Sequence, residues 1–205
     1  MHQVASSQTM SYRIRDLFLA SLGLMMFAPL MVLIMIGLWL SQGKVFFRQK
    51  RPGLHEKPFL LIKFSTLYDV KEGEDEATNQ QARLTPLGRI LRKLSLDELP
   101  QLINVIKGEM ALVGPRPLLM EYLPLYTEPE RKRHRVLPGI TGWAQVNGRN
   151  QISFKEKFAF DLWYVDNRSH RLDLRIMAMT IGKVFRSEAV YQNEKTTAEK
   201  FDGTN

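Results

Sequence analysis

The chain of 205 residues contains no cysteine, which excludes a disulfide framework and any zinc site built on thiolates. It has four histidines. His55 and His134 lack a second histidine at metal-ligand spacing, so both are expected to face solvent. Zinc-finger and RNA-recognition patterns are also missing, and no nucleic-acid partner is expected. The lack of cysteine is compatible with a reducing compartment.

Charge is missing from residues 17–40, where Leu, Met, Ile, Phe and Ala dominate. An apolar run of about 20 residues is long enough to cross the hydrocarbon core of a bilayer. Lys and Arg normally collect on the cytoplasmic side of such a run. Here they stand on both sides, as Arg13, Arg15, Lys44, Arg48, Lys50 and Arg51.

Pro29 lies in the middle of this apolar run. A proline removes one helix hydrogen bond and kinks the helix. Together with the two basic flanks, it predicts a re-entrant membrane helix over residues 12–41 that bends at Pro29 and returns to the cytoplasmic face. The alternative is a straight single span, because membrane helices tolerate proline.

The remaining sequence fits one compact cytosolic domain over residues 42–187. Residues 1–11 and the polar residues 188–205 are expected to be tails, and residues 70–81 a mobile acidic loop. The net charge of +8 suits an anionic lipid surface, a phosphorylated substrate or a nucleic acid. The basic residues beside the apolar run favour attraction to anionic headgroups.

The pattern of elements predicts an α+β fold that is mostly helical, with a small β-hairpin and amphipathic helices at the membrane interface. Strands are expected at 44–49 and 57–68, joined by the turn of Pro52 and Gly53. Helices are expected from Thr85-Pro86 onward, near 118–126 and over 172–185. Two more are expected to start at Thr127 and at Ser153, each with a glutamate at capping-box spacing, and the second would run through Val165. A short buried strand is expected at 110–113.

Two adjacent carboxylates, Asp97 and Glu98, mark the start of another expected helix. Either Ser95, with Glu98 completing a capping box, or Asp97 would be its N-cap, and Gly108 would end it. Acidic residues are common in a first turn because the helix dipole favours them. The functional alternative is a carboxylate that attacks phosphorus or holds a divalent cation where the helix start attracts phosphate.

Two cationic side chains are further candidates for phosphate contact. Arg116 stands between two prolines after Gly114, and a guanidinium fixed in this way suits bidentate phosphate binding. Lys63 lies between apolar residues in the second expected strand. The alternatives are a solvated arginine on a rigid turn and an edge-strand lysine that points to water.

These segments together resemble the small monotopic phosphoglycosyl transferases of the bacterial sugar transferase family, from about Tyr12 to the C-terminus. The ordered motifs are Arg-Pro-Gly at 51–53, Ile-Lys-Phe at 62–64, Leu-Ser-Leu-Asp-Glu-Leu-Pro-Gln-Leu at 94–102, Lys-Gly-Glu-Met at 107–110, Val-Gly-Pro-Arg-Pro at 113–117 and Pro-Gly-Ile-Thr-Gly-Trp-Ala-Gln-Val-Asn-Gly-Arg-Asn at 138–150. The closing Thr-Thr-Ala-Glu-Lys-Phe-Asp-Gly is similar to the ending of members that act in protein glycosylation.

The resemblance implies a ping-pong reaction at the cytoplasmic face of the bacterial inner membrane. Asp97 would attack the β-phosphate of a UDP-sugar, release UMP and carry the phosphosugar until polyprenyl (undecaprenyl) phosphate of the inner leaflet accepts it. Glu98 would bind Mg²⁺. The donor implied is UDP-N,N′-diacetylbacillosamine or another UDP-N-acetylhexosamine. The other polar positions implied around the site are Lys63, Arg92, Arg116, Arg149 and Asp161.

The sequence departs from the family pattern at two places. Ser65-Thr66-Leu67 replaces a basic residue, a hydroxyl residue and Met after the Lys-Phe of the strand, and Ala28 stands where a serine often precedes the kink proline. A membrane-anchored basic protein that binds anionic lipid or a partner without catalysis is the alternative function, and a tethered nucleic-acid binder is a third. Both predict that Asp97 and Glu98 are replaceable.

Overall fold

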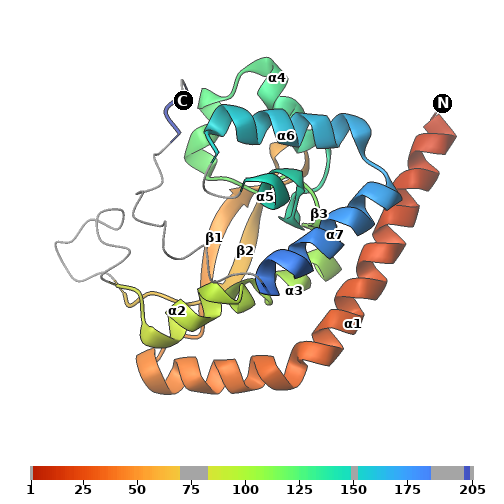
Figure 1. The fold of residues 1–205 in the computed structure, drawn as a ribbon. Helices are drawn as coiled ribbons and strands as arrows, with labels where there is room; N and C mark the ends of the chain where they lie inside the picture. The colour runs from red at the N-terminus through yellow and green to blue at the C-terminus, as the bar shows by residue number, and fades with distance from the viewer. Residues whose placement is uncertain (1, 70–82, 149–151, 186–200, 204–205) are drawn as a thin grey trace.

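The computed structural model describes residues 2–69, 83–148, 152–185 and 201–203. Its first element is the long helix α1 (His2–Gln42), which bends sharply midway so that its halves run in different directions (Figure 1). Pro29 is the single proline in this helix, and loss of a backbone hydrogen bond at proline is the usual cause of such a kink. The predicted bend is therefore present, but the segment predicted as a tail at 1–11 is helical from His2.

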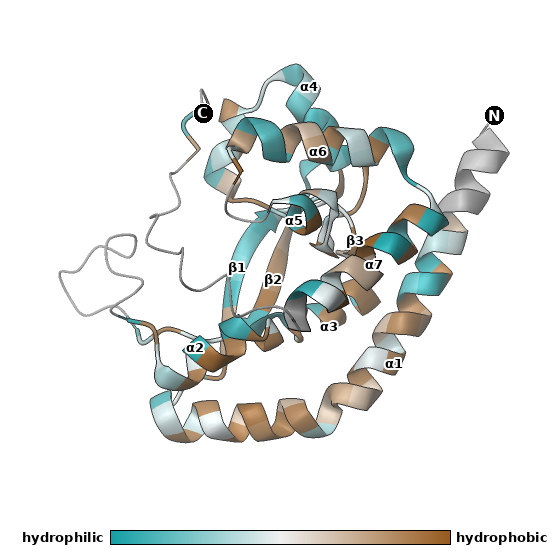
Figure 2. Ribbon diagram, in the orientation of Figure 1, coloured by the Kyte–Doolittle hydropathy of each residue, from teal (hydrophilic) through white to brown (hydrophobic). Residues whose placement is uncertain are grey.

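Most of the apolar surface of α1 is not covered by the rest of the chain. Met10–Gln42 is long and apolar enough to cross a membrane by length and composition, and only 17% of its most apolar window is buried. In the ribbon of Figure 2, most of α1 between its hydrophilic N-terminal part and its end is coloured as hydrophobic. Its exposed large side chains are Met10, Ile14, Phe18, Leu22, Met25, Met26, Val32, Leu33, Ile36, Trp39 and Leu40.

Two antiparallel strands form the predicted hairpin, β1 (Phe46–Pro52) and β2 (Pro58–Phe64), joined by the 3-10 turn η1 (Leu54–Glu56). The buried side chain of Asn104 fastens this hairpin to α3 (Gln101–Lys107). Its Oδ1 accepts from the backbone N–H of Ile62 at 3.2 Å and its Nδ2 donates to the carbonyl of Leu60 at 2.8 Å. Strand β2 is thereby held beside the helix that follows the two carboxylates.

Helix α2 (Pro86–Lys93) begins as predicted, because the Thr85 hydroxyl accepts a hydrogen bond from the backbone N–H of Gly88 at 2.8 Å. The next helix start was predicted incorrectly. Ser95 makes no cap, and Asp97 and Glu98 lie in a separate 3-10 turn, η2 (Leu96–Glu98), before α3. Pro100 is the N-cap residue immediately before α3, so its missing N–H costs no helix bond. Gly108 ends α3 in the left-handed conformation, as expected.

A second sheet pairs two short parallel strands, β3 (Ala111–Val113) and β4 (Gly139–Thr141). The backbone that follows β3 lies very close to the backbone at the start of β4. A Cβ on Gly114 would lie 2.3 Å from the carbonyl oxygen of Leu137, and one on Gly139 would lie 2.1 Å from the Gly114 nitrogen. Glycine at both positions therefore lets the loop that carries Arg116 lie directly against the start of β4.

The remaining described elements cover the other end of the domain, away from the second half of α1 (Figure 1). The capping boxes predicted at Thr127 and Ser153 are both present. The helix expected at 118–126 is present as a 3-10 helix over Met120–Leu125. These elements are η3 (Met120–Leu125), α4 (Glu128–Arg131), η4 (Lys132–Arg135), α5 (Trp143–Asn147), α6 (Phe154–Asn167) and α7 (His170–Phe185).

The C-terminal end contributes to the core, contrary to the tail predicted at 188–205. Phe201 is 4% exposed and packs in an aromatic cluster with Tyr122, Tyr126, Phe154 and Phe158. Residues 186–200 and the predicted mobile loop at 70–81 lie outside the described residues. The α+β class, with a small sheet and a long apolar N-terminal helix, is confirmed.

Candidate active site

A left-handed residue sets the position of the two carboxylates. Ser95 has φ 55° and ψ 21°, a conformation that non-glycine residues adopt rarely and that costs free energy. The chain turns there, so that the flanking Leu96 and Leu99 pack against the core shared with α1 and α2. Asp97 and Glu98, between these two leucines, face the hairpin and the Gly114–Pro117 loop. The charged side chains next to the two carboxylates come from these segments. Strain of this kind is often found at functional sites.

Glu98 is bound by two cations from different parts of the fold. The Lys63 ammonium on β2 donates to Glu98 Oε1 at 2.7 Å, and the Arg116 guanidinium donates to the same oxygen at 2.6 Å. The second oxygen, Oε2, has only a 3.4 Å contact with Arg116. Burial raises the pKa of Glu98, but the charges of Arg116 and Lys63 outweigh it and hold the net pKa well below its usual range. Glu98 is therefore ionised at any physiological pH.

Asp97 has a different environment although it is the neighbouring residue. Its side chain is buried, and among the described residues it makes no hydrogen bond or ion pair. Burial raises its pKa, and the negative charge of Glu98 raises it further, against the opposing charges of Lys63, Arg92 and Arg116. The pKa values of the two carboxylates are thus shifted in opposite directions. In catalytic carboxylate pairs, such a difference gives the two groups different roles.

The alternative for Lys63 was an edge-strand lysine that points to water. The side chain does not do so. Its ammonium lies in the ion pair with Glu98 and is largely buried. Burial lowers the pKa of Lys63, and the nearby charge of Arg116 adds to this effect, while Glu98 opposes it. The charge of Glu98 is thus the main influence that opposes this lowering.

Arg92 lies at the end of α2, on the side of the site that faces Asp97. Its Nε donates to the Thr66 hydroxyl at 2.9 Å. Thr66 lies between Ser65 and Leu67, the two residues at which this segment departs from the family pattern, and itself keeps the hydroxyl of that pattern. In this chain its hydroxyl orients an arginine whose charge acts on Asp97.

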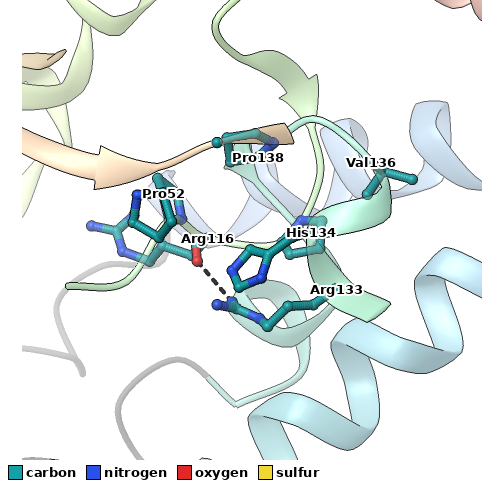
Figure 3. Close-up of a pocket in the computed structure, with 9 residues that line it drawn as sticks. Pro52, Arg116, Arg133, His134, Val136 and Pro138 are labelled. Carbon is teal, nitrogen blue, oxygen red and sulfur yellow. Dashed lines mark hydrogen bonds between the residues drawn. The ribbon is translucent and has the colours of Figure 1, made fainter. Parts of the chain in front are cut away.

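Arg116 is held through its backbone as well as through its side chain. The buried Arg133 donates a 2.8 Å hydrogen bond to the carbonyl oxygen of Arg116 (Figure 3). His134 lines the same small cavity beside Arg116 and Pro52. It is buried and not solvent-facing as expected; burial, with the charge of Arg133, lowers its pKa to about 4. A neutral imidazole there adds no charge next to the arginines.

Asp161 makes its ion pair with Arg133 and none with the cations around Glu98. Its Oδ2 accepts from Arg133 at 2.7 and 3.1 Å, and both side chains are almost completely buried. The structure therefore connects Asp161 to the site through Arg133 and the backbone of Arg116. Arg149, the remaining predicted position, lies outside the described residues.

The oxygen donors at the site are of the type that Mg²⁺ prefers, although they are few. Among the described residues there is no group of three or more Asp, Glu, His or Cys side chains that could hold a metal. Mg²⁺ commonly binds one or two carboxylates and completes its shell with substrate phosphates and water. Glu98 Oε2, with its single long contact, fits that role.

The sequence did not predict that Arg133 and Asn104 shape the site. It also did not predict that Thr66 orients an arginine there. Arg133 lies in a run of basic residues, which reads as a solvated surface. Asn104 lies on an otherwise apolar helix face. A polar residue at such a buried position was the one feature of the sequence that could have indicated its role.

Comparison with known proteins shows extensive similarity. Residues 7–187 match the model of the family described as bacterial sugar transferase. The chain is 58% identical over 160 residues to an uncharacterized sugar transferase, EpsL, of Bacillus subtilis (78% of this chain and 79% of that protein). It is 39% identical to the exopolysaccharide production protein ExoY of Rhizobium meliloti (89% and 88%). It is also 40% identical to the UDP-glucose:undecaprenyl-phosphate glucose-1-phosphate transferase of Escherichia coli, covering 87% of this chain and 41% of that longer protein.

Proposed function

The chain belongs to the bacterial sugar transferase family, and on this basis we propose that it transfers a sugar 1-phosphate from a UDP-sugar to undecaprenyl phosphate. An oxygen of Asp97 attacks the β-phosphorus of the UDP-sugar, and the bond from that phosphorus to the bridging oxygen breaks, so that UMP leaves. A phosphate oxygen of undecaprenyl phosphate then attacks the phosphorus held on Asp97. This step forms undecaprenyl diphosphate sugar and restores the carboxylate.

The observation that carries this proposal is the difference between the two adjacent carboxylates. Glu98 is bound by Lys63 and Arg116, whereas Asp97 is buried, unpaired among the described side chains and raised in pKa. A carboxylate without hydrogen bonds keeps its lone pairs available for attack on phosphorus. The cations around it stabilise the charge that develops on the phosphoryl oxygens.

We propose Glu98 as the residue that would hold Mg²⁺, with substrate phosphate oxygens and water as the other ligands. A divalent cation at this place would supply neutralisation of the phosphate charge during transfer. Glu98→Gln would then lose most activity, and excess Mg²⁺ would restore part of it. Activity of the wild type that survives thorough removal of divalent cations by a chelator would exclude this role.

Both ends of the apolar segment are attached to the same folded domain, which supports a re-entrant helix on one face of the membrane. Near the start, Arg13 donates to the carbonyl oxygen of Ile106 at 2.6 Å, and Arg15 pairs with Asp173 at 2.7 Å. Near the end, Gln42 donates to the carbonyl oxygen of Ser65 at 2.8 Å. A domain that contacts both ends supports a placement of both on one side of the membrane, and the basic flanks favour the cytoplasmic side. Exposed apolar residues on α2, directly after it and on α7 would rest on the same interface; they are Ile90, Leu94, Leu174 and Ile181.

We propose a UDP-N-acetylhexosamine as the donor, including UDP-N,N′-diacetylbacillosamine, on the resemblance of the closing residues 196–203. Several relatives are named as UDP-glucose:undecaprenyl-phosphate glucose-1-phosphate transferases, with UDP-glucose as the donor. The donors therefore need to be compared directly. UMP release from UDP-glucose and from UDP-N-acetylhexosamines, with undecaprenyl phosphate present, tests the reaction and the sugar together. Failure of every UDP-sugar to give UMP would leave the binding-protein alternative.

A further inference from the structure

Arg51 is a cation of β1 that the reaction described above does not use. Its guanidinium is half-buried and donates to the amide oxygen of Gln49 at 2.6 Å and weakly to the carbonyl of Pro117 at 3.4 Å. Both partners are neutral. Its Nε is buried and has no hydrogen-bond partner, and no carboxylate pairs with Arg51 among the described residues. Arg51 therefore has no direct ion-pair partner among the described residues, and the charge of Glu121 acts on it only from a distance.

The register of the hairpin places Arg51 on the same face as Lys63. In the antiparallel pair, Lys63 lies opposite Phe47 and Arg51 lies opposite Phe59. Residues directly opposite share a face, and so do residues two apart in one strand. Arg51 is thus four positions along this face from Lys63, or about 13 Å at the usual strand rise.

Arg116 joins these two cations. Its side chain pairs with Glu98 beside Lys63, while the following residue, Pro117, accepts the hydrogen bond from Arg51. Burial lowers the pKa of Arg51 to about 10, and the positive charge of Arg116 is the next contribution. The Arg116 side chain is 43% exposed, so a ligand can reach it. Glu98 forms an ion pair at the Lys63 end of the row, but no described carboxylate forms one at the Arg51 end.

We infer that Arg51, together with Arg116, binds the phosphate of the donor that departs with the nucleoside. This inference rests on the proposed function. Asp97 and the Glu98 group serve the phosphate that is transferred, and a diphosphate needs a second site of positive charge next to the first. A planar guanidinium with free N–H groups beside Arg116 supplies bidentate contact with phosphate oxygens. The phosphate of the lipid acceptor is the other possible source of the same chemistry.

The test compares the affinities of UMP and uridine, which differ only in the phosphate. We expect Arg51→Gln to weaken UMP binding by about tenfold, as expected for loss of a hydrogen bond to a charged group, and to leave uridine binding unchanged. The KM for the UDP-sugar should rise by a similar factor, while the KM for undecaprenyl phosphate should stay the same. Arg48→Gln is the matched control, since Arg48 is exposed on the opposite face of the same strand.

If the wild type turns over, two results would overturn the inference and leave the proposed function intact. One is an unchanged affinity of Arg51→Gln for UMP. The other is a rise confined to the KM for undecaprenyl phosphate, which would assign Arg51 to the acceptor. Absence of UMP release by the wild type would instead count against the proposed function.

If Arg51→Gln does not fold, an experiment on the wild-type protein still tests the inference. Modification of arginines by phenylglyoxal, followed by peptide mass spectrometry, should show Arg51 protected by UMP but not by uridine. Equal modification with the two ligands would refute the assignment.

Discussion

Arg133 donates a 2.8 Å hydrogen bond to the backbone carbonyl of Arg116, so a buried arginine fixes the position of an arginine of the candidate active site. Arg133 is in turn held by Asp161 at 2.7 Å, and its guanidinium lies over the rings of Tyr126 and Phe158. Asp161 thus influences the site through the backbone that presents Arg116 to Glu98. This arrangement gives Asp161 a positioning role.

We predict that Asp161→Asn lowers both stability and turnover. Removal of one partner of a buried ion pair leaves an uncompensated charge on Arg133 and costs about 3–5 kcal/mol. Thermal unfolding measures the loss of stability, and UMP release at a temperature where the variant remains folded measures turnover. Asp166→Asn, on the exposed side of the same helix, is the control and should behave as wild type. Full stability with lost activity would instead indicate that Asp161 contacts substrate.

Asp97→Asn should make the folded protein more stable at neutral pH. Burial and the charge of Glu98 raise the pKa of Asp97 in the folded state above that in the unfolded chain. Ionisation therefore opposes folding at pH values above the folded pKa, and this cost vanishes below the unfolded pKa of about 4. Asparagine carries no such cost. Melting temperatures measured from pH 7 downward should show an advantage for the variant that shrinks as the pH falls. A variant less stable than wild type at pH 7 would show that the carboxylate is a structural cap.

Sequence patterns predicted the elements whose cause is local. The Thr85 and Ser153 caps, the Gly108 stop, the hairpin turn and the bend at the single proline of α1 follow from neighbouring residues. The start of α3 was misplaced because the left-handed Ser95 is stabilised by packing of Leu96 and Leu99, which no local rule shows.

The same distinction applies to the site. Lys63, Glu98 and Arg116 were predicted from motifs and do lie together. Arg133 and Asn104 act through bonds to backbone 17 and 42–44 residues away, so their roles depend on the tertiary fold.

The absence of native cysteine allows a direct test of the membrane arrangement. Single cysteines in place of Met10 and Lys44, which are both solvent-exposed, should react equally with a membrane-impermeant maleimide added from the cytoplasmic side. Pro29→Ala should straighten the helix and shift the Met10 label toward the opposite side. Labelling of the two positions from opposite sides in the parent chain would establish a single span and exclude re-entry.

Phe201 should matter for stability despite its place near the end of the chain. Phe201→Ala empties a site among four aromatic rings next to Arg133, and we expect a loss of about 3 kcal/mol, within the usual range for a buried phenylalanine. Chemical denaturation measures this loss. Phe47→Ala, which removes a phenylalanine of β1 that is 41% exposed, is the control and should cost much less. Equal small losses for the two variants would mean that residues 201–203 do not hold the aromatic cluster.

The central claim, that Asp97 carries the phosphosugar, is tested most directly by one experiment with the donor alone. The wild-type protein mixed with its UDP-sugar and no undecaprenyl phosphate should release UMP up to one equivalent. Mass spectrometry of the trapped protein should then locate a sugar phosphate on Asp97. Asp97→Asn, which retains the shape of the side chain, should release none. An adduct on another residue, or UMP release and turnover by Asp97→Asn at the wild-type rate, would contradict the account.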